Sequence, residues 1–262
     1  MKYFIIAGEA SGDLHGSNLI KALQEKDPQS VFVGLGGDKM RDAGCSILVD
    51  YRDMAYMGFI AVIQNIGKVQ RNLKIAKQSL LKEKPDVLIL IDYPSFNLRI
   101  AKYCRRLLPH TQIIYYIPPK IWAWKEWRVH QMAKYTDDIL GIFPFEPYFY
   151  ARHGYTCQYV GNPTADSIRE WKKTHINGSK QESPATIALL PGSRRSEISH
   201  CLPIMLNAAR RVAKDTYNIR IAAAPGIDDN FYRPFIREGE TITRDTYTLV
   251  ANAHAAVVNS GT

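Results

Sequence analysis

The sequence lacks the cysteine spacings that mark a metal site or a disulfide scaffold. Four cysteines are scattered over 262 residues, and no C-x-x-C spacing occurs; they are Cys45, Cys104, Cys157 and Cys201. Widely separated thiols indicate neither a zinc site nor a disulfide framework, and they fit a protein of the reducing cytosol.

Long hydrophobic runs and an excess of acidic residues are missing as well. No stretch approaches the roughly 18 uncharged residues of a membrane span, and the apolar run at the N-terminus is too short for a secretory signal. With 34 Lys and Arg against 25 Asp and Glu, the net charge is +9. We therefore expect a protein that is soluble or lies on a membrane, with an anionic partner: a phosphate-bearing substrate, an acidic membrane surface or a nucleic acid.

What the sequence does contain is an alternation of short apolar runs with longer amphipathic ones. Apolar runs predict strands at residues 3–7, 31–34, 87–91, 113–117, 139–143 and 158–160. Between the first two, Leu19, Ala22 and Leu23 share one face of a predicted helix over 14–25. The runs are continuously apolar, as in parallel sheets that are covered on both faces. This rhythm predicts an α/β fold of βαβ units.

A second series of the same kind follows a polar segment rich in Gly, Ser and Pro at 172–184, which indicates an interdomain connection. We expect an N-terminal Rossmann-like domain over 1–165 and a C-terminal one over 166–262. The second series begins at 185–198 and continues with a strand at 219–224, helices near 230–238 and 246–253, and a last strand "AAVVNSG". That strand ends where a helix should begin, so the second domain is expected to be truncated.

The first candidate site is the loop "AGEASGDLHG" at residues 7–16, directly after the first strand. Ligands of open α/β sheets bind beyond the carboxyl ends of the strands. Capping of the next helix would explain Ser11 or Asp13, but it would not also explain Glu9 and His15. The substrate-binding residues predicted here are Glu9, Ser11, Gly12 and Asp13. Neither this loop nor "GLGGDKM" is a G-x-G-x-x-G dinucleotide motif.

The second candidate is Asp92 in "PDVLILIDYPSFN", which directly follows five apolar residues and lies at the same predicted edge. A carboxylate at that depth is partly desolvated, which raises its pKa toward the range of a general base. The alternative is that Asp92 caps the next turn. Asn97 could orient a sugar hydroxyl or stabilise the loop.

Aromatic residues gather in "IWAWKEWRVH", which contains Trp122, Trp124 and Trp127. Such rings suit sugars, bases or acyl chains, but they more often pack the core, and we expect most of this cluster there.

The sequence "LLPGSRRSEI" predicts an anion site in the second domain. Gly192 and Ser193 form a turn, and a helix then begins with Arg194 and Glu197. Backbone N–H groups at a helix N-terminus, the helix dipole and a guanidinium together bind anions. A second small-residue turn, Ser260-Gly261-Thr262, makes a diphosphate the expected ligand. No D-x-D pair ends a strand, so we predict neither a metal nor another cofactor.

A basic amphipathic stretch, "MAYMGFIAVIQNIGKVQRNLK", starts at residue 54. Its later half fits a crossover helix whose apolar stripe packs on the sheet. For the part before the basic residues, membrane or acyl-chain contact is an equal alternative; the residues concerned are Met57, Phe59, Ile60 and Val62.

Taken in order, "AGEASGD", "FVGLGGDKM", "MGF", "PDVLILIDYPSFN", "IWAW", "VGNP" and "LLPGSR" resemble the bacterial lipid-A-disaccharide synthase family. The resemblance implies an inverting glycosyltransferase with two Rossmann-like domains facing a cleft, the GT-B arrangement. It implies transfer of 2,3-diacylglucosamine from UDP to 2,3-diacylglucosamine 1-phosphate at the cytoplasmic face of the Gram-negative inner membrane. A homodimer is also compatible with the resemblance.

The resemblance also implies roles for the candidate residues. The family often has a second aspartate where this chain has Ser95, which leaves Asp92 as the one carboxylate of that turn. Asp92 is then expected to deprotonate the acceptor 6-hydroxyl, and Arg194 with the small-residue turns to stabilise the departing diphosphate. Another GT-B-like UDP-sugar transferase or epimerase, or a non-catalytic nucleotide-binding or RNA-binding protein, remains as an alternative; no RNA-recognition signature is present.

Overall fold

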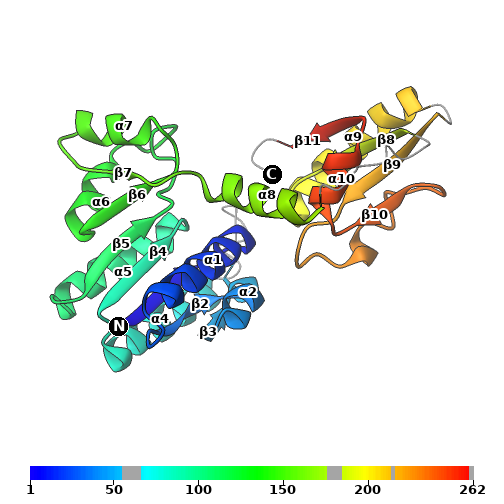
Figure 1. The fold of residues 1–262 in the computed structure, drawn as a ribbon. Coiled ribbons are helices and arrows are strands. Elements are labelled where there is room, and N and C mark those ends of the chain that lie inside the picture. The colour runs from blue at the N-terminus through cyan, green and yellow to red at the C-terminus, as the bar shows by residue number, and fades with distance from the viewer. Residues whose placement is uncertain (55–65, 176–184, 214–215, 260–262) are drawn as a thin grey trace. The chain divides into compact units, whose positions relative to one another are not determined.

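The computed structural model describes residues 1–54, 66–175, 185–213 and 216–259, and the chain divides into two compact units, Met1–Pro163 and Thr164–Thr262. Each unit has its own parallel sheet (Figure 1). Seven residues with predicted roles lie outside the described residues: Met57, Phe59, Ile60, Val62, Ser260, Gly261 and Thr262.

The first unit is built around seven parallel strands in the order β3-β2-β1-β4-β5-β6-β7. The strands are β1 (Lys2–Ala7), β2 (Val31–Gly36), β3 (Cys45–Asp50), β4 (Val87–Ile91), β5 (Gln112–Tyr116), β6 (Asp138–Gly141) and β7 (Gln158–Tyr159). The helices are α1 (Ala10–Lys26), α2 (Asp38–Asp42), α4 (Ile66–Glu83), α5 (Pro94–Leu107), α6 (Arg128–Tyr135) and α7 (Glu146–Arg152), and a 3-10 turn spans Tyr51–Asp53.

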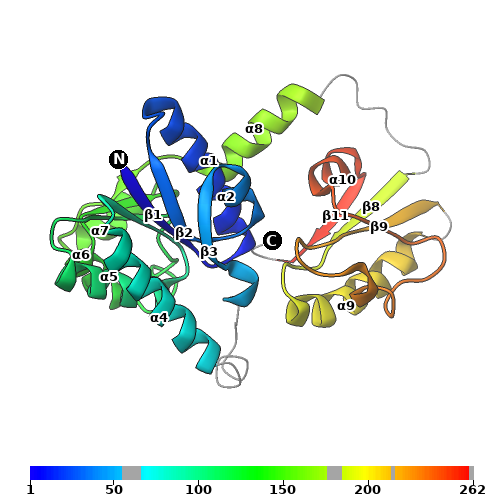
Figure 2. The same ribbon diagram turned by 90° about the horizontal axis from the view of Figure 1, so that it is seen from below.

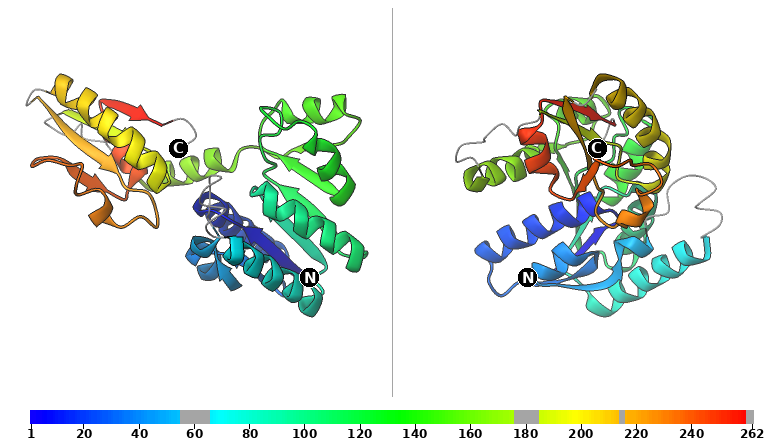
Figure 3. Two further views of the ribbon diagram at one scale, coloured as in Figure 1. Left: turned by 180° about the vertical axis from the view of Figure 1, so that it is seen from behind. Right: turned by 90° about the vertical axis from the view of Figure 1, so that its right-hand side faces the viewer.

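The apolar strands form two cores because successive side chains point to opposite faces of the sheet. Ile5 of β1 packs with Ile20 of α1 and Met40 of α2 on one face. Its neighbour Ile6 packs on the other face in a cluster that includes Leu80 of α4. Figure 2 and the right-hand view of Figure 3 show α1 and α4 on opposite sides of the strands. The predicted fold class is confirmed: an α/β protein with parallel sheets covered on both faces.

The second unit repeats this plan with four parallel strands in the order β10-β9-β8-β11. Its elements are α8 (Pro163–His175), β8 (Ala185–Leu190), α9 (Arg195–Ala213), β9 (Tyr217–Ala222), a 3-10 turn (Asp229–Phe231), β10 (Thr241–Thr243), α10 (Thr246–Asn252) and β11 (Ala255–Val258). The α9 side of the sheet holds the larger core, with Leu202 and Leu206 fully buried, and Leu249 of α10 packs on the other side.

Three features differ from the expectations. The prediction of a helix near 230–238 is wrong, because this segment forms the 3-10 turn Asp229–Phe231 followed by further turns. Pro234 has no N–H for a helical hydrogen bond, and the Asp228 carboxylate instead caps the 3-10 turn through the Asn230 N–H at 2.8 Å. Strands β3 and β10 were not expected. The start of the expected connection, residues 172–175, belongs to α8.

Candidate functional site

The two predicted loops of the first unit lie side by side. Strand β1 is bonded to β2 on one side and to β4 on the other. The strands from β1 to β3 therefore extend the sheet in one direction, and those from β4 to β7 extend it in the other. Ala7 is paired in register with Ile91, which puts Gly8 and Asp92 at neighbouring positions just beyond the sheet. A side chain at Gly8 would overlap the ring of Tyr93. This is the topological switch point at which open α/β sheets bind their ligands.

The turn after β4 is strained. Asp92 and Tyr93 both have left-handed backbone conformations, with φ of 42° and 46°, and so does the β-branched Ile117 after β5, with φ of 59°. Non-glycine residues rarely adopt such angles, and β-branched ones least of all. The two turns are linked by a hydrogen bond of 3.2 Å from the Asp92 N–H to the Ile117 carbonyl. Strain of this kind persists where the surrounding structure enforces it, and it gathers at functional sites.

Two buried side chains hold the Asp92 backbone in this conformation. Its carbonyl accepts hydrogen bonds from the Tyr115 hydroxyl at 2.6 Å and from the Asn97 amide at 2.8 Å. Asn97 is fully buried and its amide also donates to the Ile91 carbonyl at 3.2 Å. We therefore assign Asn97 the loop-stabilising alternative.

Asp92 itself is half-buried. Burial raises the pKa of the Tyr115 phenol well above its usual range, and the nearby Asp92 carboxylate raises it further. The phenol therefore stays protonated and remains a donor to the Asp92 carbonyl. Sequence reasoning missed Tyr115, because no local pattern distinguishes it from the other apolar residues of β5.

In the loop after β1 the predicted residues have different environments. Asp13 is buried, and its carboxylate accepts backbone N–H groups of Gly37, Lys39 and Met40 at 2.7, 3.1 and 3.1 Å. It therefore caps α2 and not the helix that contains it. Ser11 is exposed, whereas Gly12 is buried where a side chain would lie 3.1 Å from Ala7 Cβ.

Glu9 and His15 border the same loop. Glu9 is half-buried at the N-cap position of α1, but its side chain does not cap the helix. Burial lowers the pKa of His15, and its Nδ1 has no hydrogen-bond partner among the described residues. The loop thus presents Glu9 and Ser11, while Asp13 fixes it to the loop after β2.

The tryptophan cluster is not in the core, and that expectation is wrong. Trp122, Trp124 and Trp127 are 36%, 65% and 56% exposed. The buried anchors of this segment are Ile121 and Val129, which flank the tryptophans. The segment follows the carboxyl end of β5, and Trp122 packs there against the rings of Phe143 and Phe145.

In the second unit the turn at Gly192 lies beside Asn259, the last described residue before the second predicted turn. Strand β8 lies between β9 and β11, and Leu190 is paired with Val258. The pairing extends past the strands through a hydrogen bond of 2.9 Å from the Asn259 N–H to the Leu190 carbonyl. A side chain at Gly192, whose φ is +129°, would come within 3.2 Å of the Asn259 amide. This is the switch point of the second sheet.

The turn at Gly192 already holds an oxyanion, the carboxylate of Glu197. One oxygen accepts the N–H groups of Ser193 and Arg194 at 2.9 and 3.2 Å, and the other accepts the Arg194 guanidinium at 2.5 Å. Burial opposes ionisation, but these hydrogen bonds and the Arg194 charge outweigh it and lower the pKa of Glu197. The neighbouring Arg195 is exposed, with its guanidinium over the ring of Phe231 at 4.8 Å.

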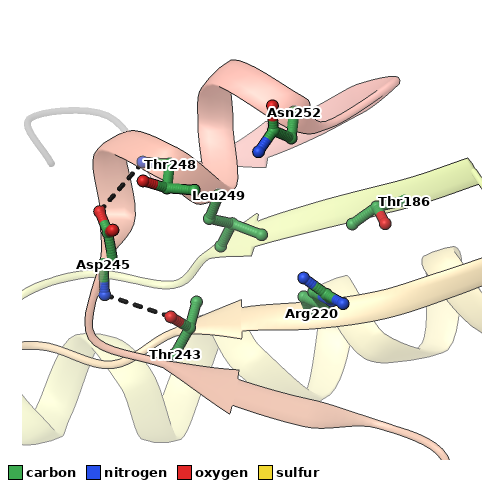
Figure 4. Close-up of a pocket in the computed structure, with 7 residues that line it drawn as sticks. All are labelled: Thr186, Arg220, Thr243, Asp245, Thr248, Leu249 and Asn252. Atoms are coloured by element: carbon green, nitrogen blue, oxygen red, sulfur yellow. Dashed lines mark hydrogen bonds between the residues drawn. The ribbon is translucent and has the colours of Figure 1, made fainter. Parts of the chain in front are cut away.

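A separate cavity of about 170 Å³ lies under α10 (Figure 4). It is lined by Thr186, Arg220, Thr243, Asp245, Thr248, Leu249 and Asn252, none of which the sequence singled out. Asp245 is occupied as the cap of α10, accepting the Thr248 N–H at 3.0 Å. The buried Thr186 hydroxyl has no hydrogen-bond partner among the described residues.

Metal-binding and thiol chemistry find little support in the described part of the chain. Within it, no group of three or more His, Cys, Asp or Glu side chains is placed to hold a metal ion. Burial raises the pKa of the Cys45 thiol to about 12 and those of Cys104 and Cys157 to about 11. These thiols are protonated at neutral pH and are poor nucleophiles and ligands. In the described ranges no helix has the length and apolar character to cross a bilayer.

Comparison with protein families gives a match over nearly the whole chain. The family described as lipid-A-disaccharide synthetase matches residues 3–262. A lipid-A-disaccharide synthase of Trichlorobacter lovleyi is 38% identical over 272 aligned positions, covering 100% of this chain and 70% of the relative. One of Geobacter sulfurreducens is 36% identical over 270 positions, with the same coverage.

Solved structures share the fold at low sequence identity. A UDP-GlcNAc 2-epimerase from Neisseria meningitidis bound to UDP-GlcNAc superposes with a TM-score of 0.70 and 11% identity, covering 100% of this chain and 78% of the epimerase. CalG4, the calicheamicin glycosyltransferase, gives a TM-score of 0.54 and 12% identity, covering 98% of this chain and 73% of its own. At such identities the likeness concerns the fold alone.

Proposed function

The chain belongs to the lipid-A-disaccharide synthase family of glycosyltransferases in lipid A biosynthesis, and we propose that it transfers 2,3-diacylglucosamine from UDP to 2,3-diacylglucosamine 1-phosphate with inversion. The observation that carries this proposal is the repeated switch point. In each unit the chain leaves two adjacent strands at neighbouring positions, Gly8 beside Asp92 in the first and Gly192 beside Asn259 in the second. One sheet edge offers a carboxylate, and the other offers an anion-binding turn.

In the proposed reaction Asp92 acts as the general base. It takes the proton of the acceptor 6-hydroxyl while that oxygen bonds to the anomeric carbon of the donor. The bond from that carbon to the diphosphate oxygen breaks, and its electron pair leaves with UDP. Glu9, Ser11 and Gly12 hold a sugar at this edge, and Asp13 acts through the loop that it fixes. The strained turn supports its role, because strain of this kind gathers at functional sites, and the half-buried Asp92 lies at the sheet edge where ligands bind.

The departing diphosphate is proposed to bind the turn of the second unit. The carboxylate of Glu197 now bonds to the Ser193 and Arg194 N–H groups, so this position is suited to an oxyanion. UDP binding then requires Glu197 to yield these donors to phosphate oxygens. Arg194 neutralises the charge that develops on the leaving group. We include the turn Ser260-Gly261-Thr262 as its second half.

The proposed lipid substrates also imply that the enzyme works at a membrane. Both substrates carry acyl chains, so we propose that the enzyme associates peripherally with the anionic cytoplasmic surface of the inner membrane. Met57, Phe59, Ile60 and Val62 are the apolar residues proposed to contact lipid, with the basic face of α4 next to them in the sequence.

Asp92→Asn and Arg194→Ala test the two roles separately. Asp92→Asn keeps the shape of the side chain but removes the base, so we expect turnover to fall by about 10²–10⁴-fold while the Kd for UDP stays unchanged. Arg194→Ala removes charge-assisted hydrogen bonds, so both turnover and UDP affinity should fall, the latter by about 10–100-fold. Transfer is measured with the acylated substrates and UDP binding by calorimetry.

Two variants serve as matched controls. Asp86→Asn changes an exposed aspartate that directly precedes β4, the strand that Asp92 directly follows. Arg211→Ala changes an exposed arginine in the last turn of α9. Both should keep normal turnover. Undiminished turnover in Asp92→Asn would remove Asp92 as the base.

A further inference from the structure

The loops after β5 and β6 and the first turn of α7 carry exposed aromatic side chains, which we call the tryptophan patch: Trp122, Trp124, Trp127, Phe145 and Tyr148. Trp124 is 65% exposed and Tyr148 is 71% exposed. Exposed rings at this density are unusual on a soluble surface, and they mark an interaction site. Three of the four tryptophans of the chain lie in this patch.

The rings are held in place by the structure beneath them. Trp122 packs edge-on against Phe145, with ring centroids 4.9 Å apart, and so joins the two loops. The buried carboxylate of Glu146 fixes the second loop by accepting the Ile142 and Phe143 N–H groups at 2.8 and 2.9 Å. The left-handed conformation of Lys125, with φ of 59°, turns the first loop between Trp124 and Trp127. Contacts within the first unit therefore hold the two loops that carry the rings.

Positive charge accompanies the aromatic rings. The Lys125 ammonium lies 4.0 Å from the ring centroid of Trp124, and the Arg128 guanidinium lies 5.7 Å from that of Trp127. Lys120 is exposed in the same loop. The one carboxylate between the tryptophans, Glu126, is bonded to His153 Nε2 at 2.8 Å. The patch therefore presents apolar rings and cations together.

We propose that the tryptophan patch docks on the surface of an anionic lipid bilayer. Tryptophan and tyrosine rings combine an apolar body with a polar N–H or O–H group, which suits the boundary between head groups and acyl chains. Lysine and arginine beside them pair with anionic head groups. This inference rests on the proposed function for its biological setting, since a transferase of acylated sugars must meet its acceptor at such a surface.

The tryptophan patch lies at the same edge of the sheet as Asp92. All strands of the first sheet are parallel, so the loops after β4, β5 and β6 leave from the same edge. Docking of the β5 and β6 loops holds the β4 loop, with Asp92, at the bilayer surface. The acceptor hydroxyl could then be deprotonated without full extraction of the lipid.

Vesicle co-sedimentation of the full chain tests the proposal. Vesicles of phosphatidylglycerol and phosphatidylethanolamine are compared with vesicles of phosphatidylcholine. The double variant Trp124→Ser/Trp127→Ser should bind the anionic vesicles at least about tenfold more weakly than the original chain. Lys125→Glu should lose the preference for anionic vesicles. Val31→Ser is the matched control, because Val31 is 52% exposed at the opposite edge of the same sheet, and its binding should not change.

Fluorescence gives an independent measurement on the same surface. In Trp171→Phe the remaining tryptophans are those of the patch, and phospholipids brominated on their acyl chains should quench them. Binding without quenching, or unchanged binding of the double variant, overturns the proposal in favour of another lipid-contacting segment. Absence of vesicle binding in the original chain overturns it as well.

Transfer to acceptor dispersed in detergent separates this proposal from the proposed function. The double variant should keep its turnover there and lose it on vesicles. Loss of turnover in detergent with normal vesicle binding would mean that the rings contact the sugar substrate, which overturns bilayer docking. If the original chain binds vesicles through the patch but transfers no sugar, the proposed function fails and the docking surface stands.

Discussion

Two carboxylates at the edges of the two sheets, Asp13 and Glu197, are bound mainly by backbone N–H groups. The sequence predicted ligand contacts for both, and for Asp13 it offered capping of its own helix as the alternative. The structure shows Asp13 as the cap of α2, which begins 25 positions later. Such a contact depends on how β1 and β2 pair, and no local pattern contains that information. The partners of Glu197 are its neighbours in the sequence, Ser193 and Arg194, but the anion-site pattern did not predict that Glu197 itself occupies the turn.

Glu197 should make stability depend on pH. Its pKa in the folded protein lies below the ordinary glutamate value of 4.5, so the folded state binds the proton more weakly than the unfolded state does. The stabilisation is then fully present above about pH 5 and is lost as the pH falls through the folded pKa. In Glu197→Gln this contribution is missing. Urea unfolding from pH 7 down to pH 4 should show a smaller loss of stability for Glu197→Gln than for the original chain. Equal slopes would contradict the assignment.

At the scale of whole elements, burial decided what the sequence could predict. Strand β4 is buried at every position, and its apolar run was recognised. Strand β3 alternates buried and exposed positions at the sheet edge, and β10 has three residues, so neither gave a continuous apolar signal. For the tryptophan loop the prediction of burial was wrong for the opposite reason, because there the apolar signal is present and the burial is not. Its apolar composition indicates burial, whereas the structure buries only the flanking Ile121 and Val129 and leaves the tryptophans exposed.

The turn between β8 and α9 gives an element-level prediction. Gly192→Ala places a Cβ 2.7 Å from Glu197 in a backbone conformation, φ of +129°, that side chains disfavour. The turn must distort, so UDP affinity should fall by about tenfold or more, as expected when oriented N–H donors are lost. Gly239→Ala is the control, since Gly239 also has a positive φ, of +85°, but has open space around it. It should cost about 1 kcal/mol of stability and leave UDP binding intact. Comparable losses of affinity in both variants would exclude a specific role for the Gly192 turn.

For the whole molecule, the informative regularity is that one plan occurs twice. Each unit has a parallel sheet, cores on both faces and a switch point at which a candidate loop begins. The alternation of apolar and amphipathic segments was enough to predict this plan. The strained turn at Asp92 was not predictable, because its backbone angles depend on hydrogen bonds with Tyr115 and Ile117 that tertiary packing brings into place.

This plan allows the two proposed substrate sides to be assigned by hydrogen exchange. The proposal assigns UDP to the second unit, and each unit has its own cores, so UDP should stabilise the second unit selectively. At about 100 times its Kd, a ligand stabilises the unit that binds it by about 2.7 kcal/mol, which slows exchange of its most protected amides about 100-fold. We expect this slowing in β8 and β9 and little change in β1 and β4. Arg194→Ala at the same UDP concentration should show a smaller effect. Equal slowing in both sheets would mean that UDP also binds the first unit, and the division into an acceptor side and a UDP-sugar side would then be wrong.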